Sequence, residues 1–153
     1  MSVSSMLRAL LAALLLGCIV MPAGASASPR HDRTEASIIH AINNARAANG
    51  LPRLRTNRGL ARAADVHSAS MARSNRVGHG AYGERVRRYV RSKRVGENLA
   101  WMTRCKADAI VQMWLNSASH RHVILSSTFR RIGVAKRSSS RMCFVTADFA
   151  SKR

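Results

Sequence analysis

The order of its two hydrophobic patterns is the feature that most constrains the fold of this chain. Apolar residues recur at helical spacing in the segments 34–50, 57–75 and 106–116. They alternate with other residues in 131–137 and 142–150, two segments joined by the turn-forming "SSSR". Helices followed by a β-hairpin favour an α+β fold over a doubly wound α/β fold.

The segments between these elements are shorter or irregular. Residues 75–83 contain three glycines and no hydrophobic period, which predicts a loop. Residues 84–93 indicate a short basic helix or turn, and 95–102 form a Gly-led apolar stretch with a single acid. Ser119 is expected to cap a short helix that ends at Leu125.

The first 27 residues have the pattern of a secretory signal peptide. Arg8 supplies the positive charge, and the apolar run that follows is shorter than the roughly 20 residues that span a bilayer. Cleavage is expected near Ala25 or Ala27, within a stretch of small residues. The alternative is a lipoprotein anchor at Cys18, in "LLGC".

Removal of the signal peptide leaves residues 28–153, the usual size of one domain. No other apolar stretch in this part is long enough to cross a membrane. Cys105 and Cys143 then form an even pair in an exported chain, which predicts one disulfide. We expect the exported protein to be a monomer.

The charge balance is strongly positive. The chain has 26 Lys and Arg against seven acids, and loss of Arg8 with the signal peptide leaves about +18. Such a surface attracts anionic polymers and lipid headgroups, with an affinity that falls as salt rises. Aromatic residues make up 5% of the chain, too few for the base-stacking platforms of single-strand binders. The composition therefore predicts no dedicated nucleic-acid site.

Five fragments resemble one known family when they are taken in order. They are "NNARAANGLPRLRTNRGLARAADVHSASMA", "VGHG", "GENLA", "VQMWLNSASHRHVIL" and "FRRIGVA", and with a final strand they cover roughly residues 35–149. The chain resembles the CAP superfamily of cysteine-rich secretory, antigen 5 and pathogenesis-related proteins, particularly its compact bacterial secreted members. The resemblance implies a three-layer α-β-α sandwich with a cleft lined by two histidines and two acids.

Carried over residue by residue, the resemblance implies the following cleft. The first histidine is His79 in "VGHG", the first acid is Glu97 in "GEN", and the second histidine is His120. The second acid of the animal and plant members aligns near Asn116, so this chain departs from their pattern.

Three kinds of chemistry suit two imidazoles and one carboxylate. They can bind zinc or another divalent metal and leave a position open for water. They can hold a proton for general acid catalysis. They can also form a hydrogen-bonded network that fixes the walls of the cleft.

The remaining histidines have weaker claims to a functional role. His67 falls on a mostly apolar helix face, which favours a core histidine with its hydrogen bonds satisfied. His122 lies two residues from His120 on a short helix, so we expect it on the other side, in solvent. His31 and His40 have no evident partners in the sequence.

Trp101 and Trp114 are both predicted to lie in the core. The serines closest to a histidine in the sequence, Ser68, Ser117 and Ser119, do not stand in a GxSxG elbow. A disulfide would leave no thiolate for attack. The sequence therefore gives little support to a serine or cysteine hydrolase.

Together these features predict a secreted protein that is a ligand-binding protein rather than an enzyme. The expected ligand is a lipid or sterol, as the resemblance implies, or an anionic polymer of the cell envelope, as the charge indicates. One alternative is a zinc-dependent hydrolase of peptide or envelope substrates that uses His79, His120 and Glu97. Another is a cationic antimicrobial or virulence-type effector whose activity is its surface charge.

Overall fold

The computed structural model describes residues 33–152. The expected signal peptide, the alternative anchor at Cys18 and His31 lie outside these residues. Four strands form one sheet in the order β1-β3-β4-β2. They are β1 (Arg55–Thr56), β2 (Val95–Met102), β3 (Phe129–Ser138) and β4 (Cys143–Ser151). The hairpin of β3 and β4 is central, with β2 antiparallel to β4 and β1 parallel to β3.

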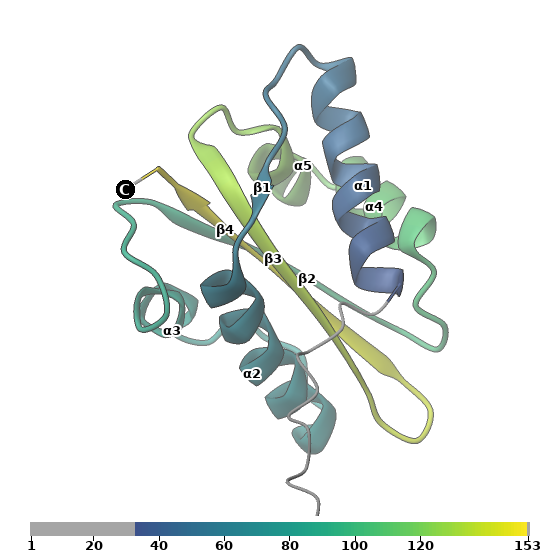
Figure 1. Ribbon diagram of the computed structural model, residues 1–153. Coiled ribbons are helices and arrows are strands. Elements are labelled where there is room, and N and C mark those ends of the chain that lie inside the picture. Colours follow the sequence, from purple (N-terminus) through teal and green to yellow (C-terminus); the bar gives the residue numbers. More distant parts are fainter. Residues whose placement is uncertain (1–32, 153) are drawn as a thin grey trace, which may run out of the picture.

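Helices cover both faces of this sheet and make the three layers visible in Figure 1. On one face lie α1 (Arg33–Ala48), α4 (Ala107–Asn116) and α5 (Ala118–Leu125), and on the other α2 (Arg58–Ser74) and α3 (Tyr82–Arg87). The α+β class and the three-layer arrangement predicted from the sequence are confirmed. Among residues 33–152, no helix combines the length and the apolar character that crossing a membrane requires.

The strands send alternate side chains to the two helical layers, as a period of two requires. In β4, Val145 and Phe149 belong to the large apolar cluster that contains the inward face of α1. Between them, Thr146 accepts a hydrogen bond from Ser68 of α2, and Asp148 accepts one from Arg85 of α3. The two faces of one strand therefore serve different layers.

Asparagine and glycine residues mark three of the helix ends. The side chain of Asn57 accepts a hydrogen bond from the backbone N–H of Leu60 at 3.0 Å, which caps the start of α2. Asn75 ends α2 in the left-handed conformation, with φ of 50°. Gly50 follows α1 with φ of +66°, a conformation that glycine adopts without a steric penalty.

Gly133 of β3 allows α2 to lie directly on the sheet. A Cβ atom at this position would be 2.0 Å from the backbone nitrogen of Ala61 and 2.2 Å from the carbonyl carbon of Leu60. Any side chain here would push the helix away, and α2 carries part of the candidate site described below.

Three details differ from the prediction. Residues 95–102 form the edge strand β2, and the short strand β1 was not expected. The Ser119 cap is wrong, because α5 begins at Ala118 and Ser117 holds the N-cap position without a side-chain hydrogen bond. Trp101 is 55% exposed rather than part of the core, because it lies on the edge strand; Trp114 is fully buried as predicted.

Two connections hold elements of the apolar layer in place. The predicted disulfide is confirmed: it joins Cys105 before α4 to Cys143 at the start of β4. The buried guanidinium of Arg46 in α1 donates to the carbonyls of Ile124 at 2.6 Å and Ser126 at 2.9 Å. These bonds hold the segment between α5 and β3, which lines a cleft.

Candidate functional site

Two carboxylates lie side by side on neighbouring strands under α2 and α3. Glu97 of β2 and Asp148 of β4 are register partners in the antiparallel ladder, and their side chains are completely buried or nearly so. Like charges directly opposite one another destabilise a sheet. The arrangement therefore needs a cation between them.

Arg85 of α3 provides that cation. Its Nη2 atom donates to Glu97 Oε2 at 2.5 Å and to the two Asp148 oxygens at 2.9 and 3.1 Å. Burial raises the pKa of the Asp148 carboxyl to about 7; Arg85 opposes this effect and Glu97 adds to it. One guanidinium thus holds both acids, and Asp148 titrates near neutral pH.

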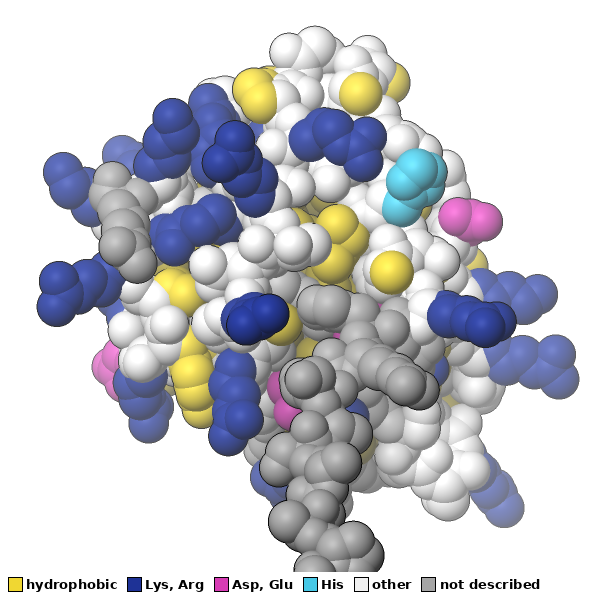
Figure 2. Space-filling view, in the orientation of Figure 1, with side chains coloured by type: hydrophobic (Ala, Val, Ile, Leu, Met, Phe, Trp, Pro, Cys, Tyr) yellow, Lys and Arg dark blue, Asp and Glu magenta, His cyan; other side chains and the backbone are white. Residues whose placement is uncertain are grey.

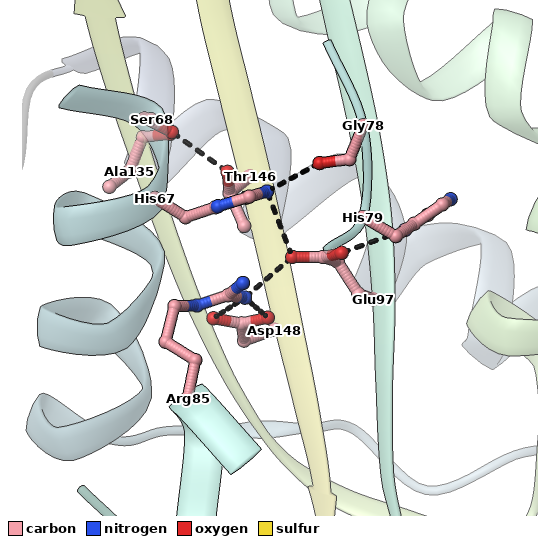
Figure 3. A network of polar contacts seen from close by, with 9 residues as sticks. All are labelled: His67, Ser68, Gly78, His79, Arg85, Glu97, Ala135, Thr146 and Asp148. Carbon is pink, nitrogen blue, oxygen red and sulfur yellow. Dashed lines mark hydrogen bonds and ion pairs between the residues drawn. The ribbon is translucent and has the colours of Figure 1, made fainter. Parts of the chain in front are cut away.

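His79 approaches Glu97 from the loop between α2 and α3. Its Nδ1 atom lies 2.7 Å from Glu97 Oε1, and the side chain is 52% exposed. A carboxylate can only accept, so Nδ1 carries the hydrogen. Figure 3 shows the far ring nitrogen, Nε2, directed away from the network. Glu97 therefore fixes both the tautomer and the orientation of an exposed imidazole.

His67 of α2 completes this network on its other side. Its Nε2 atom is 2.9 Å from the carbonyl oxygen of Gly78 and 3.7 Å from Glu97 Oε2. Burial lowers the pKa of His67, and the charge of Arg85 lowers it further. As predicted, His67 has a hydrogen-bond partner, but it lies at the edge of the candidate site and supports the loop that carries His79.

His120 lies near this group without touching it. Its Nδ1 atom is buried and has no hydrogen-bond partner within residues 33–152, while its backbone oxygen accepts from Asn98 at 3.1 Å. Burial lowers the pKa of His120, and His79 adds to that effect. Asn116 is the exposed last residue of α4. The structure thus joins His79 and Glu97 directly, but not His120 or Asn116.

A cleft of about 1260 Å³ opens beside His79. It lies between the loop and helix α3 on one side and α5 with its following turn on the other. Its lining includes Glu97 and the exposed His122, but neither His120 nor Asn116. The residues that line it are His79, Gly80, Tyr82, Arg87, Lys93, Arg94, Val95, Gly96, Glu97, Ala118, Arg121, His122, Val123, Leu125, Ser126, Ser127, Thr128 and Phe129.

The donor atoms at this site do not fit a zinc ion. Within residues 33–152, no three His, Cys, Asp or Glu side chains are grouped to hold a metal. Both oxygens of Glu97 already accept from His79 and Arg85. Catalytic zinc sites commonly have three protein ligands. The function proposed for this site therefore does not use a metal.

The sequence interpretation missed Arg85 and Asp148. Asp148 interrupts the apolar alternation of a central strand, and a buried acid in such a place needs a buried cation. That signal was present in "TADFA". Arg85 carried no comparable signal, because it is one of many arginines in a basic segment.

These features define a class: a three-layer α-β-α domain with an acid-oriented histidine at the mouth of a cleft. Residues 39–149 match the Cysteine-rich secretory protein family, also called CAP, and the chain belongs to this family.

Three similar proteins illustrate the match. The chain is 31% identical over 107 residues to "Uncharacterized membrane protein YlbC" of Bacillus subtilis (strain 168), which covers 66% of this chain and 31% of that protein. It is similar to an extracellular protein containing a SCP domain from Bacillus anthracis str. Ames, with a TM-score of 0.71, 30% identity and coverage of 78% and 41%. An outer surface protein from Borrelia burgdorferi shares the fold, with a TM-score of 0.73, 18% identity and coverage of 81% and 96%. The chain thus spans less than half the length of the first two proteins.

Proposed function

We propose that this protein acts outside the cell and binds an anionic lipid of the cell envelope in the cleft beside His79. The observation that carries the proposal is the composition of the cleft wall, which combines free positive charge with an apolar strip. Proteins described as extracellular or as an outer surface protein share its fold, which supports the location.

The charged part of the wall is positive. Arg87, Lys93, Arg94 and Arg121 all line the cleft, and all four are exposed. The single acid of the lining, Glu97, has both oxygens occupied. The wall therefore attracts an anionic headgroup, and the attraction weakens as salt screens it.

The apolar part of the wall lies next to this charge. Val95, Val123, Leu125 and Phe129 contribute to the lining and are partly or largely buried. Each 100 Å² of apolar ligand surface that they remove from water would stabilise the complex by about 2.5 kcal/mol before the costs of association. A polar polymer would use the charges but gain nothing from this strip, so an acyl chain is the better ligand.

His79 adds a directed contact at the mouth of the cleft. Because the Nδ1–H of His79 is directed at Glu97, the outward Nε2 is the ring atom that can form a hydrogen bond with a ligand headgroup.

The test uses dihexanoyl phosphatidylglycerol below its micelle concentration, titrated into the protein by calorimetry. The variant Lys93→Gln/Arg94→Gln removes two exposed charges of the cleft, and Arg62→Gln/Arg73→Gln removes two exposed charges of α2 that lie outside its lining. We expect the cleft variant to bind about tenfold more weakly and the α2 variant within about twofold of the parent.

Two comparisons decide the outcome. Phosphatidylcholine of the same chain length should bind much more weakly than phosphatidylglycerol, because its headgroup has no net charge. Equal losses in the two double variants would contradict a cleft site and favour an effector that acts through its net charge alone.

A further inference from the structure

A second hollow lies at the edge of the sheet where β1 meets β3, and its lining is almost entirely cationic. This groove of about 700 Å³ is lined by Pro52, Arg53, Arg55, Asn57, Arg130, Arg131 and Lys152. Five of these seven residues carry positive charge and none is acidic. Figure 2 shows Lys and Arg side chains gathered at the upper left, around β1 and the end of β4, without an acidic side chain among them. We call this hollow the β1–β3 groove.

The strand register brings two of these charges together. Arg55 of β1 and Arg131 of β3 are partners in the parallel ladder. Like charges directly opposite one another on adjacent strands repel. The positive potential also reaches the interior: burial lowers the pKa of Arg46, and the charge of Arg130 lowers it further. The lining therefore concentrates positive charge of the kind that attracts an anionic ligand.

Two of the guanidinium groups are already held in place. Arg131 donates to the carbonyl oxygen of Ser151 at 2.7 Å through Nη2 and at 3.1 Å through Nε, and Nη2 also reaches Arg91 O at 2.9 Å. Arg130 donates through Nη1 to the carbonyl oxygens of Ser127 and Phe129. Groups that are fixed before binding lose little conformational entropy when a ligand arrives.

We propose that the β1–β3 groove binds a linear chain of phosphate groups without bases. Even without Arg131, whose guanidinium donates to backbone carbonyls, four cations line the groove, which is more charge than one phosphate can neutralise. The guanidinium fork also matches phosphate oxygens in pairs. None of the seven described residues that line the groove is aromatic, so bases would find no surface for stacking. Among those seven, only Pro52 is apolar, so an acyl chain would gain little there.

The groove and the cleft have no lining residue in common. The inference therefore does not rest on the function proposed for the cleft, and the two can fail separately. A phosphate chain in the groove would position the protein on an envelope polymer while the cleft remains open.

The test uses poly(glycerol phosphate) of about ten repeats, with a fluorescent label, and measures binding by anisotropy at several salt concentrations. The groove variant is Arg53→Gln/Arg55→Gln/Lys152→Gln, which changes three exposed side chains. Its matched control is Arg62→Gln/Arg73→Gln/Arg76→Gln. It removes two exposed charges from α2 and one just after its end, all outside the groove.

We expect the groove variant to bind at least about tenfold more weakly, with the slope of log Kd against log salt reduced by about 2, as for three lost phosphate contacts. The control should stay within about threefold of the parent. Equal losses in the two triple variants would overturn the groove as the site. The cleft variant Lys93→Gln/Arg94→Gln should keep most of its polymer affinity, which separates this test from that of the lipid.

Three further probes identify the ligand class. Unlabelled polymer should displace the labelled polymer. Orthophosphate at the same concentration should not displace it. Polyglutamate of the same charge should bind more weakly than poly(glycerol phosphate), and equal binding would overturn the preference for phosphate. Single-stranded DNA with the same number of phosphates should bind no more tightly, and tighter binding would overturn a base-free ligand.

Discussion

The two faces of the sheet are held in opposite ways. Towards α1, α4 and α5, the strands present apolar side chains such as Ile132, Val145 and Phe149. Towards α2 and α3, the sheet presents Glu97 of β2 and Asp148 of β4 to a shared arginine. The first face can gain stability from any well-packed apolar group, whereas the second depends on the positions of individual atoms.

This difference separates stability from positioning. Burial of one large apolar side chain contributes about 1.5–3 kcal/mol and has little directionality. A buried ion network contributes little net stability, because desolvation offsets the attraction, yet its geometry is fixed by its hydrogen bonds. The polar face therefore serves to orient His79 at the cleft, and the apolar face keeps the sheet folded while it does so.

The largest expected effect tests the apolar face. Trp114 is fully buried and its Nε1–H donates to the carbonyl oxygen of Leu99 at 2.7 Å. Trp114→Ala should lower the free energy of unfolding in urea by about 3–5 kcal/mol, because it removes a large buried ring and leaves a cavity. The loss should be similar at pH 5 and pH 8, since no titrating group takes part.

Trp114→Phe is the control for this prediction. It keeps most of the ring but leaves the Leu99 carbonyl without its donor, so a loss of about 1–3 kcal/mol is expected. An alanine variant that loses less than the phenylalanine variant would mean that the apolar face is not one continuous core.

The apolar face was also the part that sequence patterns could predict. The helices around Ile38, Leu60 and Trp114 follow from spacing alone, as do the strands of the hairpin. These patterns depend on which face of an element is apolar, and that property is local in the sequence. The ends of the second helix were also predicted, at residues 57 and 75, where the structure shows Asn57 and Asn75 as its caps.

The candidate site was predicted only in part because its contacts are not local. The pair of His79 and Glu97 was inferred from motifs, but Arg85 and Asp148 are separated by 63 positions and meet only in the folded sheet. His120 was expected to face His79 across the hollow. It lies close enough for the charge of His79 to lower its pKa, but His122 rather than His120 is among the residues that line the cleft.

The next prediction tests the polar face by its response to pH. The pKa of Asp148 is raised to about 7 in the folded protein, from about 3.9 in an unfolded chain. The folded state therefore holds an extra proton between these values, and the stability that it confers is lost as pH rises through 7. Asp148→Asn has no such proton to lose. Between pH 5 and pH 8, its free energy of unfolding should therefore fall by about 2 kcal/mol less than that of the parent.

Comparison of the parent with Asp148→Asn isolates the contribution of the Asp148 carboxyl. Arg85 from α3 and Glu97 from β2 face Asp148 in both proteins, and His67 from α2 lies behind Glu97. The lowered pKa of His67 acts in the opposite direction, since its stabilisation is lost as pH falls, and it is present in both. Parallel pH profiles for parent and variant would show that Asp148 stays ionised throughout this range.

The smallest expected effect concerns a tryptophan that belongs to neither face. Trp101 is 55% exposed on the edge strand β2, beside a shallow groove lined by Val77, Met142 and Phe144. Trp101→Ala should change the free energy of unfolding by less than about 1 kcal/mol, because more than half of its surface stays in water in the folded protein. Iodide should quench the native fluorescence of Trp114→Phe, in which Trp101 remains, far more than that of Trp101→Phe. Equal quenching, or a loss as large as that of Trp114→Ala, would place Trp101 within the packed interior and remove the distinction between the edge of the sheet and its two covered faces.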